Sequence, residues 1–134
     1  MLSYKQYLSE STMGININDS EYPWTDYIMS GKKTIETRNT PTLRPYIGKR
    51  VGIIQTGKGK AKLIGYMTIE KEIEYDKESW AKDKSKHLVD SELGDGEKKY
   101  GYVIGKVEKI TPQEINSKGI VARKINENLQ AMAN

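Results

Sequence analysis

Gly31 divides the most informative part of this sequence into two segments with different periodicities. Before it, residues 22–30 place aromatic and aliphatic side chains on one face of a helix of about two turns, with Ser20 or Asp19 available as the N-cap. After it, residues 33–37 are rich in β-branched side chains, which favour a strand. Because glycine readily adopts the left-handed conformation that ends a helix, the sequence predicts a helix, a tight turn and a strand in direct succession.

The predicted strand carries several charged side chains. Since side chains alternate between the two faces of a strand, Glu36 and Arg38 are expected on the same face as Thr34, close enough to form an ion pair. Lys33 has the parity of Ile35 on the opposite face, but it lies at the turn, where alternation is unreliable. The sequence therefore leaves open whether Lys33 turns toward Glu36.

The rest of the chain contains further runs that are typical of strands. These runs are residues 14–18, 49–55, 62–73 and 100–110. Gly65 lies within the longest run and indicates a bulge or a tight bend there. Residues 39–45 hold two prolines and two threonines and are expected to form a loop, whereas residues 56–60 are expected to form a flexible hairpin tip.

A second helix is expected at about residues 77–89, with Asp76 as its N-cap. Trp80 and Leu88 are expected to form its buried stripe, which places Trp80 in the core. His87 has no serine, cysteine or aspartate partner at a diagnostic spacing. We therefore expect His87 to be an exposed residue of this helix.

The length of 134 residues predicts a single domain, residues 1–134, because it allows one sizeable core but not two. We expect residues 1–13 to be an N-terminal extension and residues 113–134 to be a polar C-terminal segment, with short helices at 3–10 and 125–132. Roughly five strands and a few short helices, in an order without regular alternation, favour a small mixed or closed β-sheet over a doubly wound fold.

Composition excludes several classes of site. The chain has no cysteine and one histidine, so we expect neither a disulfide framework nor a thiolate or histidine metal centre, and we expect no cofactor. No run approaches the roughly 18 apolar residues of a membrane span, and the N-terminus lacks the order of a signal peptide, so we expect a cytoplasmic protein. The net charge of +4 and the isoelectric point near 9.1 permit attraction to phosphates.

Lys33, Glu36 and Arg38 are the candidate catalytic residues. They provide a cation for phosphate, a carboxylate that accepts amino protons and a planar fork for a base edge or phosphate. The alternative is a surface ion network that stabilises the strand by about 0 to 1 kcal/mol per exposed pair. Further candidates are aromatic side chains that can stack on bases and lysines that can contact phosphates, although the hairpin lysines could equally serve solubility. These ligand-binding candidates are Tyr22, Trp24 and Tyr46, together with Lys32, Lys58, Lys60 and Lys62.

These motifs make the chain resemble the ASCH domains of the PUA-like superfamily. The motifs that carry the resemblance are Gly31-x-Lys33-x-x-Glu36-x-Arg38, the preceding Pro23-Trp24, residues 46–51 before a strand, and residues 100–104 in the closing strand. The similarity extends over roughly residues 14–112, which is most of the chain. Because several motifs occur in the family's order, the resemblance is more specific than a single motif match.

The resemblance implies a fold and a function. The fold is α+β, a small PUA-like β-barrel of about five to six strands with flanking short helices. The function is the binding of RNA, a nucleotide or a nucleoside in a cleft lined by Lys33, Glu36 and Arg38, with ribonuclease activity as an extension of it. No cofactor is implied, and we expect a monomer.

Two other functions stay open at this point. Some members of the superfamily are amidohydrolases that act on N4-acetylcytidine with a lysine of this turn, a threonine at i+3 and a downstream glutamate. Lys33 matches the lysine, whereas Glu36 occupies the threonine position. The other alternative is a protein-interaction module without catalysis. A deep pocket beside Lys33 would favour a small molecule, a shallow basic groove would favour an RNA strand, and a broad apolar patch would favour a protein partner.

Overall fold

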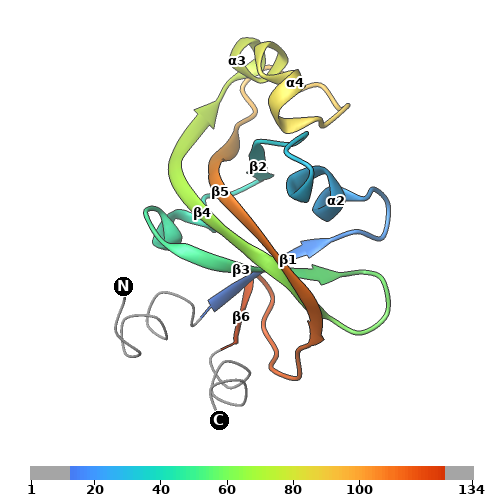
Figure 1. Cartoon of the computed structure of the whole chain (residues 1–134). Coiled ribbons are helices and arrows are strands. Elements are labelled where there is room, and N and C mark those ends of the chain that lie inside the picture. Colours follow the sequence, from blue (N-terminus) through green and yellow to red (C-terminus); the bar gives the residue numbers. More distant parts are fainter. Residues whose placement is uncertain (1–12, 126–134) are drawn as a thin grey trace.

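The computed structural model describes residues 13–125 as a strongly curved sheet with a few short helices (Figure 1). The elements in chain order are β1 (Met13–Asn18), α2 (Trp24–Met29), β2 (Ile35–Arg38), the 3-10 helix η1 (Arg44–Tyr46), β3 (Arg50–Thr56), β4 (Lys62–Tyr75), α3 (Lys77–Lys82), α4 (Lys84–His87), β5 (Lys99–Glu114) and β6 (Ala122–Lys124). The helix expected at 3–10 lies outside the described residues, as does the one expected at 125–132 apart from Ile125. Among residues 13–125, no helix has the length and apolarity needed to cross a membrane.

The six strands form one mixed sheet in the order β2-β5-β4-β3-β1-β6. β1 and β3 run parallel, with Ile15 opposite Ile53, and the other neighbouring strands are antiparallel. β4 and β5 have 14 and 16 residues and bend together across the molecule (Figure 1). This bend brings β2 round toward β1, where Nη2 of Arg38 donates a 2.8 Å hydrogen bond to the carbonyl of Asn16. The expected α+β fold with a small, barrel-like sheet is therefore confirmed.

Gly65 allows two neighbouring elements to approach β4 closely. The pairing of β4 with β5 changes register between Leu63 and Gly65, as the expected bulge requires. A Cβ atom at position 65 would collide with the Glu108 carbonyl oxygen of β5 and with the Met29 methyl group of α2. The glycine thus serves both the bulge and the packing of α2 on the sheet.

The main hydrophobic core lies between the strands and α2. Its buried members are Ile15, Ile17, Ile28, Leu43, Val51, Ile53, Met67, Ile69, Tyr102 and Ile104. A second cluster joins the start of β2 to α3, and it consists of Ile35, Tyr75, Trp80 and Leu93. Trp80 is 2% exposed, which confirms its expected place in the core. Each fully buried aliphatic side chain contributes about 1.5–3 kcal/mol, so the two clusters fix α2 and α3 against the sheet.

The expectation of one helix at 77–89 is wrong, because the structure has two short helices, α3 and α4, with a break at Asp83. Asp76 does cap α3, since its carboxylate accepts a 2.9 Å hydrogen bond from the N–H of Ser79. The carboxylate of Asp83 accepts a 2.7 Å hydrogen bond from the hydroxyl of Tyr75 in β4. This contact holds the break against the sheet.

The structure also overturns the expectation that His87 is exposed. The His87 ring is completely buried and stacks on the Trp80 indole, and its i, i+7 spacing from Trp80 places it on the same helix face. Leu88, the expected partner of Trp80 in the buried stripe, instead ends α4 in the left-handed conformation with φ of 63° and is only half-buried. His87 thus takes the inward position that the sequence assigned to Leu88.

Candidate functional site

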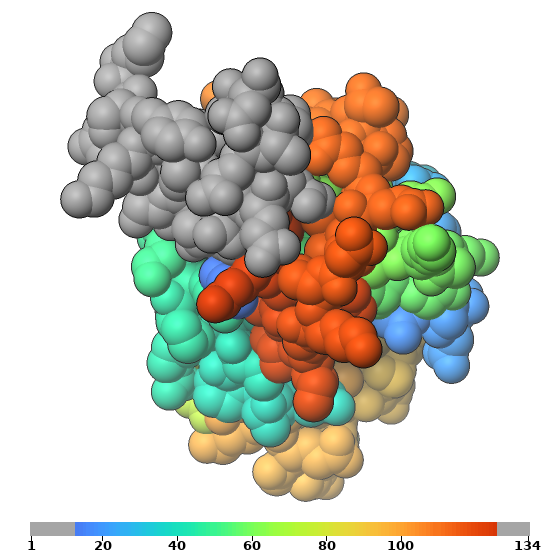
Figure 2. Space-filling model, turned by 90° about the horizontal axis from the view of Figure 1, so that it is seen from below, coloured from blue at the N-terminus to red at the C-terminus, as the bar shows by residue number. Residues whose placement is uncertain are grey.

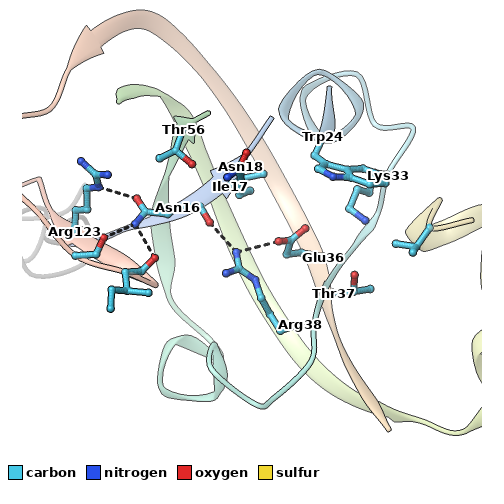
Figure 3. A pocket seen from close by; sticks show the side chains of 13 residues that line it. Asn16, Ile17, Asn18, Trp24, Lys33, Glu36, Thr37, Arg38, Thr56 and Arg123 are labelled. Atoms are coloured by element: carbon cyan, nitrogen blue, oxygen red, sulfur yellow. Dashed lines mark hydrogen bonds and ion pairs between the residues drawn. The ribbon is translucent and has the colours of Figure 1, made fainter. Parts of the chain in front are cut away.

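A cavity of about 420 Å³ opens where the curved sheet brings β2 close to β1 (Figure 3). Its walls come from β1, β2, the start of α2, the end of β3, and residues near positions 89 and 119–123. The lining residues are Asn16, Ile17, Asn18, Trp24, Lys33, Glu36, Thr37, Arg38, Thr56, Val89, Gly119, Ile120 and Arg123. The structure therefore brings the candidates Trp24, Lys33, Glu36 and Arg38 together around one cavity.

The turn after α2 sets the direction of Lys33. Gly31 has φ of 80°, the left-handed conformation expected for the residue that ends the helix. The N–H of Lys33 donates a 2.9 Å hydrogen bond to the carbonyl of Tyr27, and the N–H of Thr34 donates a 3.0 Å hydrogen bond to the carbonyl of Lys86 in α4. Lys33 consequently reaches the cavity wall, which settles the orientation that the sequence left open.

The ammonium group of Lys33 is almost completely removed from solvent. The residue is 2% exposed, its Nζ donates a hydrogen bond to the carbonyl of His87, and Nζ lies 4.6 Å from the centre of the Trp24 ring. Burial lowers the pKa of Lys33 from its usual value, while the nearby carboxylate of Glu36 raises the pKa and the guanidinium of Arg38 lowers it. Removal from water is the largest of these effects, so Lys33 loses its proton more readily than an exposed lysine does.

Glu36 and Arg38 form the ion pair that their i, i+2 spacing in β2 predicts. Nη2 of Arg38 lies 3.0 Å from Oε2 of Glu36, and the two side chains are 19% and 10% exposed. The same Nη2 also bonds the Asn16 carbonyl across the gap between β2 and β1 (Figure 3). Nε of Arg38 is buried without a hydrogen-bond partner among residues 13–125. The pair is thus largely buried in a cavity wall, which differs from an exposed ion network.

Asn16 connects three parts of the cavity wall and was not a candidate from the sequence. Its Nδ2 donates hydrogen bonds of 2.9 and 3.0 Å to the carbonyls of Gly119 and Ile120, and its Oδ1 accepts a 3.0 Å hydrogen bond from Nε of Arg123. With the bond from Arg38 to its own carbonyl, Asn16 joins β1 to β2 and to the segment before β6. The alternation of residues 14–18 predicted the strand, but no local pattern indicated that residues 119–123 would lie beside it.

A buried carboxylate anchors α2 beside the cavity. The expected helix at 22–30 is confirmed in a shorter form with Pro23 as N-cap. Asp19 nevertheless caps the helix from outside, since Oδ1 accepts a 3.1 Å hydrogen bond from the N–H of Thr25 and Oδ2 accepts one from the Thr25 hydroxyl. Gln55 of β3 donates a further 2.8 Å hydrogen bond to Oδ2 of Asp19. This network holds the first turn of α2, and with it Trp24, against β3.

The other aromatic candidates and Lys32 lie outside the cavity wall. Tyr22 is 46% exposed and its ring centre is 5.1 Å from that of Trp24, at the outer side of α2. The ammonium of Lys32 is exposed and lies 5.6 Å from the ring centre of Tyr27. Tyr46 ends η1 and packs, half-buried, against the main core. None of these three candidates is among the residues that line the cavity.

The lysines at and beside the β3–β4 turn also lie outside the cavity, although this turn begins at Thr56 in its wall. Lys58 and Lys60 are exposed on the turn, and Nζ of Lys60 is 3.8 Å from a carboxylate oxygen of Glu114. Lys62 is half-buried at the start of β4. In Figure 2, seen from below, the green turn lies to one side of the orange-red C-terminal part of the described chain, and the teal residues before β3 lie to the other side.

Glu36 supplies the only carboxylate among the residues that line this cavity. Downstream, Glu72 accepts hydrogen bonds from Arg44 and Tyr102, and Glu74 pairs with Lys98 at 2.8 Å, both away from the cavity. Within residues 13–125, no group of three or more histidine, aspartate or glutamate side chains is arranged to hold a metal ion. The chemistry of the cavity therefore comes from two guanidinium groups, one ammonium, one carboxylate, amides and hydroxyls.

Comparisons with known proteins show the family and the fold of this chain. The ASCH domain model matches residues 21–111. The crystal structure of ASCH from Zymomonas mobilis superposes with a TM-score of 0.71 at 19% identity, covering 92% of this chain and 94% of that one. Crystal structures of two mutant forms of the same ZmASCH protein give a TM-score of 0.71 at 18% identity and cover 92% of this chain and 97% and 95% of theirs. A comparison with curated proteins finds no match. The fold is thus the expected PUA-like α+β barrel, and the chain belongs to the ASCH domain family.

Proposed function

We propose that the cavity binds one nucleotide or nucleoside unit, either free or within single-stranded RNA. The observation that carries this proposal is the convergence of buried Lys33 with the Glu36–Arg38 pair on one cavity. Lys33 and Arg38 offer donors to phosphate or base carbonyl groups, and the carboxylate of Glu36 accepts an N–H or O–H of a ligand. Such donors and acceptors are effective here because little water competes with the ligand.

The size of the cavity supports a single unit as the ligand. Ligand pockets measure roughly 300–1,000 Å³, and this one has about 420 Å³. A strand of RNA would place one nucleotide in the cavity and its neighbours on the surface beside it. The protein-interaction alternative has weaker support, because among residues 13–125 the exposed large apolar side chains are only Tyr22, Ile47 and Ile120.

Hydrolysis is the second candidate function, and the lowered pKa of Lys33 favours it. A less protonated Lys33 could act as general base for a ribonuclease or a nucleoside amidohydrolase, with Glu36 and Arg38 beside it. The amidohydrolase pattern fits less well, because Glu36 replaces its threonine and no downstream glutamate up to residue 125 lines the cavity. Glu36→Gln separates the two functions: binding should weaken by about 1.5–3 kcal/mol at most, whereas turnover that needs the carboxylate should fall roughly 10²-fold or more.

Titration calorimetry with the four nucleosides, their 5′-monophosphates and short single-stranded RNAs tests the proposed binding. Lys33→Met should weaken the binding of an accepted ligand roughly tenfold or more, the equivalent of one charge-assisted contact. Lys32→Met is the matched control, because Lys32 is the adjacent lysine but lies outside the cavity. This variant should bind the ligand with unchanged affinity. Equal losses in both variants, or no binding of any compound, would contradict the proposal.

A further inference from the structure

The ring of His87 is held in one protonation and tautomeric state by two backbone groups. Nδ1 accepts a 3.0 Å hydrogen bond from the N–H of Val89, and Nε2 lies 2.8 Å from the carbonyl of Trp80. A nitrogen that accepts from an N–H carries no proton, so Nε2 carries the single proton and donates it to the Trp80 carbonyl. The ring also stacks on the Trp80 indole, with centres 3.8 Å apart and planes 16° apart.

The short turn that follows this ring supports the cavity. The carbonyl of His87 accepts the hydrogen bond from Nζ of Lys33, and the Val89 side chain lines the cavity. One residue earlier, the carbonyl of Lys86 accepts the hydrogen bond from the N–H of Thr34. Residues 86–89 thus bond the main chain of Thr34 and the ammonium of Lys33, and they form part of the same cavity wall.

The turn needs support because its middle residue is strained. Leu88 has φ of 63°, which is unfavourable for a residue with a branched side chain. The hydrogen bond from Val89 to Nδ1 of His87 closes this turn, in the way that an asparagine side chain closes an Asx-turn onto the N–H two residues later. Without that acceptor, the turn loses the hydrogen bond that keeps the His87 carbonyl directed at Lys33.

We propose that His87 is a positioning residue that fixes Lys33 in the cavity through its own backbone carbonyl. Its ring is not among the residues that line the cavity, so it acts through the turn and not by touching a ligand. The inference concerns the free protein, and only its consequence for affinity rests on the proposed function. Burial lowers the pKa of His87, as do the charges of Lys33 and Lys84, whereas the Trp80 carbonyl and Asp83 raise the pKa.

Two substitutions separate closure of the turn from filling of the core. His87→Asn retains an acceptor for the N–H of Val89 in an Asx-turn but loses the stacking on Trp80. His87→Leu retains apolar volume beside Trp80 but loses the acceptor. If His87 only filled the core, the leucine variant would be the better replacement, whereas a positioning role makes the asparagine variant better.

NMR titration of the lysine side chains is the deciding measurement, with the Lys33 signal assigned from a Lys33→Arg variant. In the wild type, Lys33 should titrate at lower pH than an exposed lysine normally does. In His87→Asn the Lys33 midpoint should stay at this lowered value. In His87→Leu the ammonium loses its fixed acceptor, so the Lys33 midpoint should move away from the wild-type value. An unchanged Lys33 midpoint in a folded His87→Leu variant, or a larger change in the asparagine variant, would overturn the proposal.

The wild type provides a second measurement that needs no variant. Protonation makes both ring nitrogens of His87 donors, so Nδ1 can no longer accept from Val89. The side-chain signals of Lys33 should then shift with the same midpoint as the His87 ring, and absence of that shift would also overturn the proposal. Affinity for the nucleoside 5′-monophosphates should fall in His87→Leu as in Lys33→Met. If no form of the protein binds them, the proposed function fails while the two titrations still decide the role of His87.

Discussion

At the scale of single residues, the cavity wall contains groups whose burial is unfavourable. Lys33 is almost fully buried, and its ammonium has one hydrogen-bond acceptor and an aromatic face where water would offer more partners. A methionine would fill the same space without this desolvation. Polar groups that are buried at a cost to stability are concentrated at functional sites. The arrangement around Lys33 is therefore easier to explain by ligand binding than by stability of the fold.

His87 gives a residue-scale prediction about pH. Its pKa is lowered in the folded protein relative to about 6.5 in an unfolded chain. Between the folded and the unfolded pKa, the unfolded state binds more protons than the folded state. The stabilising contribution of His87 is therefore complete above pH about 6.5 and is lost as the pH falls through the folded pKa. The free energy of unfolding, measured with urea, should therefore decrease below pH about 6.5 by at most about 1.4 kcal/mol per pH unit.

His87→Asn is the control for this pH dependence. The chain has one histidine, so the variant has no side chain that normally titrates between pH about 5 and 7. Its unfolding free energy should be nearly flat over that interval, and most carboxylates contribute only at lower pH. The same slope in wild type and variant would show that His87 is not the source.

At the scale of elements, the sequence predicted what depends on neighbouring residues and missed what depends on distant ones. The Gly31 turn, the Asp76 cap, the Gly65 bulge and the Glu36–Arg38 pair follow from local patterns, and all are present. The break between α3 and α4, which Tyr75 of β4 holds through a hydrogen bond to Asp83, was missed. Such contacts arise from sheet register and curvature, which no short stretch of sequence contains.

The same reasoning applies to the elements that complete the cavity. Asn16 became part of the site because β6 and the segment before it add to the edge of β1, a pairing between residues more than 100 positions apart. The family resemblance identified residues of β2 and α2 but carried no information about Arg123. The available signal for Asn16 was its polar side chain in a predicted strand. A strand with neighbours on both sides leaves such a side chain few places to face solvent.

The anchoring of α2 gives an element-scale prediction. Thr25→Val keeps the shape of the side chain but removes the hydroxyl that donates to the buried carboxylate of Asp19. Because Asp19 retains its bonds to the Thr25 N–H and to Gln55, the loss should be about 1–3 kcal/mol of unfolding free energy. Urea unfolding measures this loss. Thr68→Val is the control, because Thr68 is a half-buried threonine of β4. Equal effects of both substitutions would contradict the anchoring role.

At the scale of the whole molecule, the cavity lies at the place where the curved sheet does not close. Long β4 and β5 carry β2 around to β1 (Figure 1), and the bond from Arg38 to the Asn16 carbonyl spans the gap. The β3–β4 turn begins in the wall of this gap at Thr56 and then presents Lys58 and Lys60 to solvent. A strand of RNA with one nucleotide in the cavity could therefore place its neighbouring phosphates near these lysines.

The salt dependence of binding tests this extended path. Each phosphate that a lysine neutralises releases counterions, so for a single strand the slope of log K against log salt changes by about 0.7 per contact. Affinity for a short single-stranded RNA, followed by fluorescence anisotropy, should fall steeply with salt, and replacing both Lys58 and Lys60 with glutamine should reduce the slope by up to about 1.4. Replacing exposed Lys71 and Lys82 with glutamine changes the net charge equally at positions away from the cavity wall, and it should leave the slope unchanged.

Binding of a single mononucleotide should be unaffected by either pair of substitutions, because the cavity itself is intact. A flat salt response, or the same reduction from both pairs, would remove the turn from the path of the RNA and leave the cavity as the whole binding site.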